Sequence, residues 1–169
     1  MPNKVTVSDA ALRQAAEEGM DAFVDIFVDA INAAVGGKLT ADTMAQLNAS
    51  QITLLAYRIL RDEVMDGGFI QLIHNGYGGF IFLNPFAKMV KQWGITELGR
   101  LVSKVHSYYK KYREEIEKDC TDEEFMSLFE RFPIFDDFDD TFVEHEEEWT
   151  AAIAQYIDGH IEEFAEIVN

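Results

Sequence analysis

The sequence predicts an all-α protein, a single compact helical domain of about seven to eight helices with a glycine-rich interhelical turn. Apolar residues recur at spacings of three and four over most of the chain, which is the period of an amphipathic helix. Glycine pairs and prolines separate these periodic stretches. Only the short, ambiguous run from Gly79 to Leu83 could be a strand, because no other segment alternates persuasively between apolar and polar residues.

The first helical stripe covers residues 8–35, and the pair Gly36-Gly37 supplies its stop signal. A second stripe covers residues 51–65 until Gly67-Gly68 interrupts it. After a glycine-rich bend, Asn84-Pro85 predicts the start of a third helix with proline at its first position, because proline lacks the N–H that a helix start leaves unpaired. We expect this helix to end at Gly94.

The second half of the chain continues the helical period over residues 96–118. Thr121 and Glu124 match a capping box that opens a short helix, which Pro133 closes. Thr141 and Glu144 repeat this pattern and predict the start of a last helical region with a break near Gly159. The acidic run 136–140 is then expected on a turn before that helix.

Composition favours one domain over residues 1–169, since 48% of the residues are hydrophobic and 13 are Phe. Cys120 is the single cysteine, which excludes an internal disulfide and fits a reducing compartment. The N-terminal segment lacks the apolar core of an export signal, and no run approaches the ~20 apolar residues that span a bilayer. We therefore expect a cytoplasmic protein without a membrane partner.

The net charge of −17 is concentrated in the last third of the chain. Residues 1–60 hold 4 basic and 7 acidic residues, residues 61–112 hold 7 and 4, and residues 113–169 hold 3 and 20. A surplus of acidic residues that is confined to residues 113–169 favours an acidic surface, which attracts cationic partners and repels nucleic acid and anionic membranes.

The most distinctive local string runs from Glu63 to Gly78 and surrounds the pair Gly67-Gly68. Its amide side chains predict a sharp interhelical turn, because they can hydrogen-bond backbone groups that a bend leaves without partners. A phosphate-binding loop is not expected, since the string has neither the lysine nor the preceding strand that such loops use. A small-molecule or enzymatic pocket at this turn is the alternative, built from Gln71, His74, Asn75 and Tyr77.

An ordered set of residues in this string resembles the bacterial DNA-mimic family of roughly nineteen kilodaltons, many of whose members are known only as a domain of unknown function. The similarity covers about residues 51–169, and the helices expected over about 8–50 are not recognised. It implies a helical fold and a non-catalytic protein whose carboxylates imitate DNA phosphates and sequester a helix-turn-helix transcription factor. The residues that carry it are Glu63, Gly67, Gly68, Phe69, Gln71, Asn75 and Gly78.

The family's acidic contact residues lie outside this motif, so this chain must supply its own partner-binding carboxylates. A helix places side chains at i and i+4 about 6 Å apart along its axis, which is close to the ~7 Å between neighbouring phosphates on one strand of B-form DNA. Like charges at this spacing are not explained by helix stability. A merely solvated acidic face is the competing interpretation. The candidates are Asp136, Asp137, Asp139, Asp140, Glu146, Glu147, Glu148, Glu162, Glu163 and Glu166.

No catalytic, metal or cofactor site is expected. Residues 137–148 place oxygen ligands as a calcium loop does, but Phe142 stands where the loop needs glycine. His145 lacks the second histidine of a zinc hydrolase motif, and Cys120 has mostly acidic neighbours, which do not favour a catalytic thiolate.

The sequence therefore predicts an acidic protein-binding module, a monomer or homodimer without cofactor or direct nucleic-acid partner, that binds a basic protein such as a DNA-binding transcription factor. Two other functions stay open, the pocket at the glycine-rich turn and an immunity or antitoxin-type protein that neutralises a basic toxin.

Overall fold

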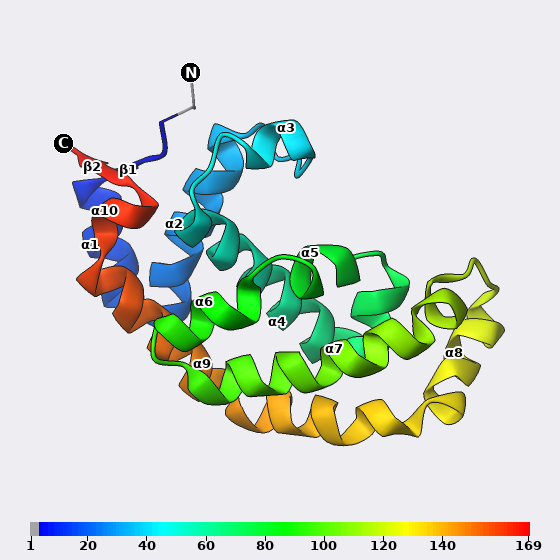
Figure 1. Cartoon of the computed structure of the whole chain (residues 1–169). Helices are drawn as coiled ribbons and strands as arrows, with labels where there is room; N and C mark the ends of the chain where they lie inside the picture. Colours follow the sequence, from blue (N-terminus) through cyan, green and yellow to red (C-terminus); the bar gives the residue numbers. More distant parts are fainter. Residues whose placement is uncertain (1–3) are drawn as a thin grey trace. The chain divides into compact units, whose positions relative to one another are not determined.

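The computed structural model describes residues 4–169, which fold almost entirely into helices (Figure 1). The predicted all-α class is confirmed. Met1–Asn3, the first residues of the segment expected to lack an export signal, lie outside the described part. In chain order the elements are β1 (Thr6–Ser8), α1 (Asp9–Glu18), α2 (Met20–Ala34), α3 (Ala41–Met44), α4 (Ala49–His74), α5 (Gly78–Phe82), α6 (Phe86–Gln92), α7 (Thr96–Glu117), α8 (Asp122–Arg131), the 3₁₀ helix η1 (Pro133–Phe135), α9 (Asp136–Gly159), α10 (Ile161–Phe164) and β2 (Glu166–Val168).

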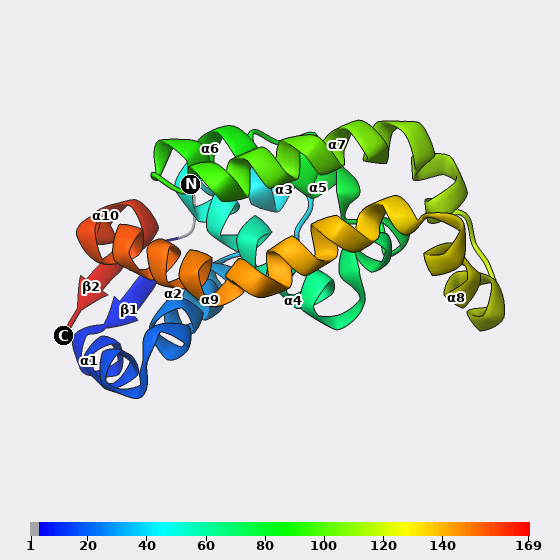
Figure 2. The same cartoon turned by 90° about the horizontal axis from the view of Figure 1, so that it is seen from below.

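The described residues form ten α-helices, more than the seven to eight expected, because three of them are single turns or little more. One of the short helices, α5, covers Gly78–Phe82, where the ambiguous strand was considered. The two strands instead join the ends of the chain. β1 and β2 pair in parallel with Val7 opposite Ile167 (Figure 2).

The stripe over residues 8–35 forms two helices, not one, because Gly19 separates α1 from α2. Gly19 has φ = 129°, a region that side chains disfavour, so the chain turns there while the apolar period continues. Ser8 begins α1, and its hydroxyl accepts a hydrogen bond from the N–H of Ala11.

Three predicted boundaries in the second half can be compared with the structure. The capping box of Thr121 and Glu124 is confirmed, and α9 ends at Gly159 as expected. The capping box at Thr141 was wrong, since α9 begins at Asp136 and Thr141 lies inside it. Its hydroxyl donates to the carbonyl of Asp137. A start signal was present earlier, because Pro133 opens η1 and acidic residues fill the first turn of α9.

The acidic run 136–140 is therefore helical and does not lie on a turn. Residues 137–148, the run with calcium-loop spacing, lie in the same continuous helix and cannot wrap around an ion. In α6, Pro85 is the residue before the first helical residue and not the first residue itself, a shift of one position.

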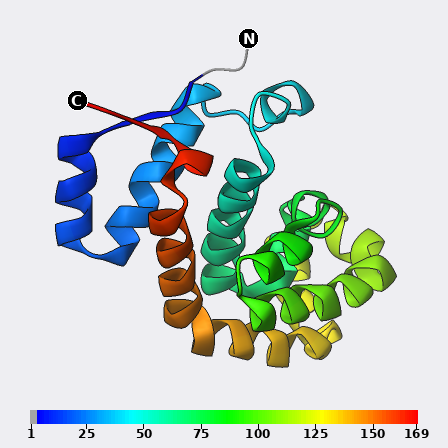
Figure 3. The same ribbon diagram turned by 60° about the vertical axis from the view of Figure 1, so that its left-hand side comes forward.

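The chain divides into two compact units, and the divisions fall within α4 and α9. The first comprises residues 4–55 and 148–169 of the described chain. Here α1 and α2 form a hairpin beside the C-terminal part of α9 (Figure 3), and Phe27 packs edge-on against Phe164 with ring centroids 6.4 Å apart. That the whole of 1–169 folds as a single domain remains a prediction.

The second unit comprises residues 56–147. Its core is aromatic: Phe69 meets Phe142 edge-on, with centroids 6.5 Å apart, and Tyr109 packs against Phe82 at 4.8 Å. Phe69 and Phe142 have no exposed surface. Among the described residues, no helix combines the length and the apolar character that crossing a membrane requires.

A kink divides α4 at Gly67 and Gly68, which have non-helical backbone angles. Gly68 has φ = 75°, and a Cβ there would collide with the carboxylate of Asp139. This carboxylate accepts a hydrogen bond of 2.8 Å from the N–H of Phe69, a donor next to the break in the helix. The kink is thus held by a side chain seventy residues away in the sequence.

Substituting Gly68→Ala should lower the free energy of unfolding by about 2–4 kcal/mol, because it strains the backbone and displaces the carboxylate that accepts from Phe69. Urea unfolding followed by circular dichroism measures the effect. Gly159→Ala is the matched control, since its added Cβ meets no atom within 4 Å. A Gly68→Ala variant as stable as Gly159→Ala would contradict this account of the kink.

Candidate functional site

The first half of α9 separates its acidic residues onto two faces. Asp139 and Glu146 share a face with Phe142, which is fully buried. The acidic residues between them point the other way, because a helix turns 100° per residue and positions three or four apart share a face. The exposed acidic residues of α9 within residues 136–147 are Asp136, Asp137, Asp140, Glu144 and Glu147, called here the α9 acidic row.

Glu146 belongs to the core of the second unit and not to its surface. Its exposed fraction is 7%, and it forms an ion pair of 2.5 Å with Arg61 of α4. A charge removed from water in this way requires its partner, since the pair's attraction offsets two desolvation costs. Glu146, one of the predicted partner-binding residues, therefore exposes little of its surface to solvent.

Asp139 is half-buried and accepts the hydrogen bond from the N–H of Phe69. Burial, helped by the neighbouring carboxylates of Asp136 and Asp140 and opposed by the hydrogen bond from the Phe69 N–H, raises its pKa to about 7. This carboxyl group therefore supports the kink in α4. It titrates near neutral pH, unlike an ordinary aspartate.

The α9 acidic row has no internal counter-charge. None of its five carboxylates forms an ion pair with any residue in the range 4–169. The chain contains no lysine or arginine after Arg131, so the segment that carries the row offers no cation of its own. From Asp137 onward, neighbours in the row follow one another at three or four residues, and Asp136 lies four residues before Asp140. These spacings correspond to about 4.5–6 Å along the helix axis.

Helix-start effects explain only part of the row. Asp136 and Asp137 lie in the first turn of α9, where a negative charge stabilises the helix by about 0.3–1 kcal/mol. Asp140, Glu144 and Glu147 lie beyond that turn. Glu144 was assigned a capping role from the sequence, which the interior position of Thr141 excludes.

The other predicted carboxylates lie in the first unit and have varied environments. Glu148 of α9 and Glu162 of α10 are exposed and make no ion pair within the described chain. Glu163 accepts hydrogen bonds from Ser50 at 2.6 Å and from Tyr156 at 3.1 Å. Glu166 of β2 pairs with Lys4 at 2.7 Å, with both side chains largely exposed.

The amide side chains of the glycine-rich string hydrogen-bond acidic side chains of α4. Gln71 donates to Glu63 at 2.7 Å and to Asp66 at 3.0 Å, and Asn75 donates to Glu63 at 3.1 Å. Gly67 has no room for a Cβ beside Gln71. The amides of the motif therefore form hydrogen bonds across the kink, from the residues after Gly67-Gly68 to carboxylates before it.

Two further residues of this region were candidates for a pocket. The Nδ1 atom of His74 lies 2.8 Å from the carbonyl oxygen of Ile116, and Tyr77 is exposed at the end of the string. Gly78 lies against the ring of Tyr109 and has no space for a side chain. The polar groups Gln71, His74 and Asn75 are thus engaged within the protein.

The sequence of this helical chain can be compared with known proteins. Residues 45–160 match the family described as DMP19-like protein, which is more than two thirds of the chain. The chain belongs to the DMP19-like family. This confirms the similarity inferred from the string, and the matched region begins slightly before the predicted boundary at residue 51.

One relative in this family is the DNA mimic protein DMP19 of Neisseria meningitidis serogroup B (strain ATCC BAA-335 / MC58). It is 32% identical over 127 residues, which cover 75% of this chain and 77% of the relative. Helices α1 and α2 precede the residues that match the DMP19-like family.

A pattern in the sequence does distinguish the inward acidic residues from the outward ones. Asp139, Phe142, Glu146 and Trp149 follow one another at spacings of three, four and three, so they lie on the apolar stripe of α9. Phe142 and Trp149 are buried, and the two acidic residues share their face. The number of acidic residues alone, without their spacing along the helix, does not separate the inward residues from the outward ones.

The half-buried carboxyl of Asp139 predicts a pH-dependent stability. Because its folded pKa of about 7 exceeds its unfolded value, the folded state holds the proton more tightly, and this stability is lost as the pH rises through 7. Relative to Asp139→Asn, the wild-type protein should lose on the order of 2 kcal/mol of unfolding free energy between pH 5.5 and pH 8.5. Urea unfolding at both pH values measures this difference.

Asp139→Asn keeps an oxygen that accepts the hydrogen bond from Phe69. Other titrating groups are present in both proteins, so their effect drops out of the difference in unfolding free energy; His106, whose pKa is lowered by burial, is one of them. Asp137→Asn, at an exposed position of the same helix, is the control and should follow the wild type. An equal change in unfolding free energy between the two pH values for wild type and Asp139→Asn would contradict the raised pKa of Asp139.

The buried ion pair predicts a large difference between two adjacent glutamates. Glu146→Gln should destabilise the protein by about 3 kcal/mol, because it removes the buried carboxylate charge that pairs with Arg61. Glu147→Gln should change stability by less than about 0.5 kcal/mol, since Glu147 is exposed. Thermal unfolding of both variants tests the division of α9 into two faces, and equal effects would contradict it.

Proposed function

We propose that this protein is a non-catalytic DNA mimic, whose α9 acidic row occupies the DNA-binding surface of a basic protein. The observation that carries the proposal is the exposed row of five carboxylates without an ion pair within residues 4–169. A helix-turn-helix transcription factor is the proposed class of partner, and the cytoplasm the proposed location.

The chemistry of the row suits a surface that evolved to bind phosphates. DNA-binding proteins neutralise phosphates with lysine and arginine, and this electrostatic term supplies much of their affinity. Carboxylates held at about 4.5–6 Å along a rigid helix offer the same cations a regular anionic array. The array carries no bases, so it would compete for the phosphate-contacting residues.

The solvated acidic face is the competing explanation, and the energetics of α9 disfavour it. Like charges three or four residues apart destabilise a helix by a few tenths of a kcal/mol per pair. The row contains four such pairs, Asp136 with Asp140, Asp137 with Asp140, Asp140 with Glu144, and Glu144 with Glu147. An acidic row that destabilises its own helix and has no counter-charge within the described residues is explained by a cationic partner protein that binds it.

The relationship to the DNA mimic protein of Neisseria meningitidis supports the same function. The glycine-rich motif is engaged in the kink of α4 and not at the acidic surface. In this chain the motif therefore serves the fold, while the exposed carboxylates would decide which partner it binds.

The proposal is tested by reversing the charge of the row. The variant Asp136→Lys/Asp137→Lys/Asp140→Lys/Glu144→Lys should lose capture of DNA-binding proteins from a cell extract, because a cationic row repels their DNA-contacting surfaces. Captured proteins are identified by mass spectrometry. Those bound to the wild type should be released by duplex DNA, and their binding should weaken as salt is raised.

Asp139 and Glu146 stay unchanged in this variant because they support the fold. A matched variant reverses four exposed acidic residues of the N-terminal helices and their connection, and it should capture as the wild type does. If the row variant retains capture, or if duplex DNA does not compete, this surface is not the mimic. The control residues are Glu17, Glu18, Asp29 and Asp42.

A further inference from the structure

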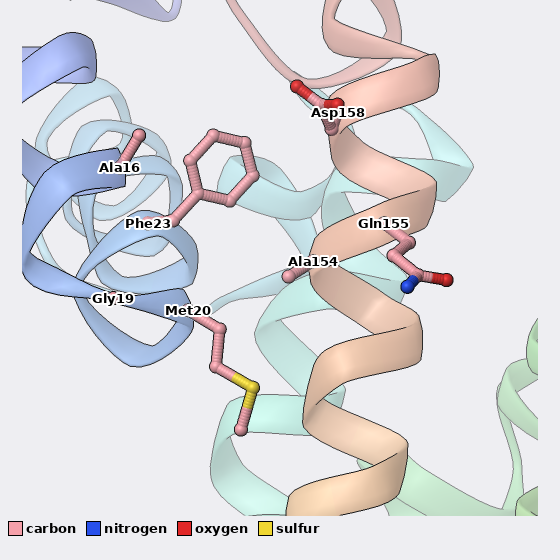
Figure 4. A pocket seen from close by; sticks show the side chains of 7 residues that line it. All are labelled: Ala16, Gly19, Met20, Phe23, Ala154, Gln155 and Asp158. Atoms are coloured by element: carbon pink, nitrogen blue, oxygen red, sulfur yellow. The ribbon is translucent and has the colours of Figure 1, made fainter.

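The first unit contains an open pocket between the α1–α2 hairpin and the last turns of α9 (Figure 4). Its volume is about 300 Å³, at the small end of the range for ligand sites. This space suits one inserted side chain better than a helix or a cofactor. The lining residues are Ala16, Gly19, Met20, Phe23, Ala154, Gln155 and Asp158.

The pocket has an apolar floor and an acidic rim. Phe23 and Ala154 are 8% and 9% exposed, and Met20 adds a flexible thioether beside them. The carboxylate of Asp158 lies on the rim, whereas the amide of Gln155 points away from the hairpin (Figure 4). Asp158 is exposed and forms no ion pair within the described part of the chain.

The turn between α1 and α2 makes this space possible. Gly19 has φ = 129°, and a Cβ at this position would meet no atom within 4 Å, so no side chain fills the corner where the two helices join. Ala16 presents only a methyl group one turn earlier. Small residues on the hairpin thus leave the floor accessible.

The charges of the first unit determine which ligand fits. Its residues 4–55 and 148–169 include 12 acidic and 3 basic side chains. Two of the cations, Lys4 and Arg13, already form ion pairs with Glu166 and Asp9. A ligand at the rim is therefore expected to be cationic, and the apolar floor requires an apolar stem on the same ligand.

We propose that this pocket receives an arginine side chain of the DNA-binding partner. The inference rests on the proposed function, because DNA-binding proteins present arginine on their phosphate-contacting surfaces. The aliphatic stem packs on Phe23 and Ala154, and the guanidinium donates two hydrogen bonds to Asp158. Arginine fits better than lysine, since its planar, weakly hydrated head group pairs with a carboxylate in a fork and stacks on aromatic rings.

The position of the pocket gives it a role in choosing the partner. Residues 16–23 precede the region that matches the DMP19-like family, which begins at residue 45, whereas residues 154–158 lie at its end. The pocket therefore combines family residues with a hairpin outside the match. It would select among basic proteins by the placement of one arginine, beyond the attraction of the α9 acidic row.

The test uses the full-length protein and two blocked peptides, acetyl-Ala-Arg-Ala-amide and the same peptide with citrulline, which has the shape of arginine without its charge. Nuclear magnetic resonance follows the methyl group of Met20 and the backbone amides of Phe23 and Ala154. The arginine peptide should shift these signals saturably at millimolar concentration, and the citrulline peptide should bind at least about fivefold more weakly.

Two variants locate the effect. Asp158→Asn should weaken binding of the arginine peptide about fivefold, and Ala16→Leu should abolish it by filling the pocket. Asp42→Asn and Ala33→Leu, at exposed positions of the same unit that do not line this pocket, should bind as the wild type does. An unchanged amide spectrum away from the substitution establishes that each variant is folded.

The pocket assignment is overturned if citrulline binds as well as arginine, if Asp158→Asn has no effect, or if the shifts spread over all surface acids without saturation. Failure of the proposed function has a different signature, since captured proteins would then be insensitive to duplex DNA and to reversal of the α9 acidic row. Both proposals are supported if Asp158→Asn weakens binding of the arginine peptide and if charge reversal of the α9 acidic row abolishes capture of DNA-binding proteins.

Discussion

The hydrogen bond from the N–H of Phe69 to Asp139 is the interaction on which the second unit depends. Two consecutive glycines break α4 and leave a backbone donor beside the break, and a buried donor without an acceptor costs about 1–3 kcal/mol. The carboxylate comes from α9, seventy residues later. It joins the two helices at the point where Phe69 and Phe142 form the core, so one bond links the kink in α4 to the rotation of α9.

That rotation decides which acidic residues of α9 meet solvent. With Asp139 turned toward the kink and Glu146 paired with Arg61, the helix has no freedom to present these two outward. The remaining acidic residues fall on the opposite side and form the α9 acidic row. Inward and outward carboxylates are therefore neighbours in the sequence, and the contacts of Asp139 and Glu146 fix which side of α9 carries the row.

The glycine-rich motif and the acidic row have separate physical roles. Gln71 and Asn75 bind Glu63 across the kink, an arrangement that stabilises the bend and needs nothing from outside the protein. The α9 row lacks such partners within the described residues. In this chain the bend is therefore maintained by residues that take no part in the exposed acidic row.

The sequence by itself determined the helical class, most helix boundaries and the surplus of negative charge, because these depend on local periodicity, capping residues and composition. It also identified the family through an ordered local string. The start of α9 was misplaced by five residues, because Thr141 and Glu144 imitate a capping box inside a helix. The apolar period of α9 marks the face that carries Asp139 and Glu146, but only the tertiary structure supplied their partners, since an aspartate that accepts from a backbone N–H seventy residues away has no local signature. Burial and long-range pairing, not charge alone, decided which carboxylates a partner can reach.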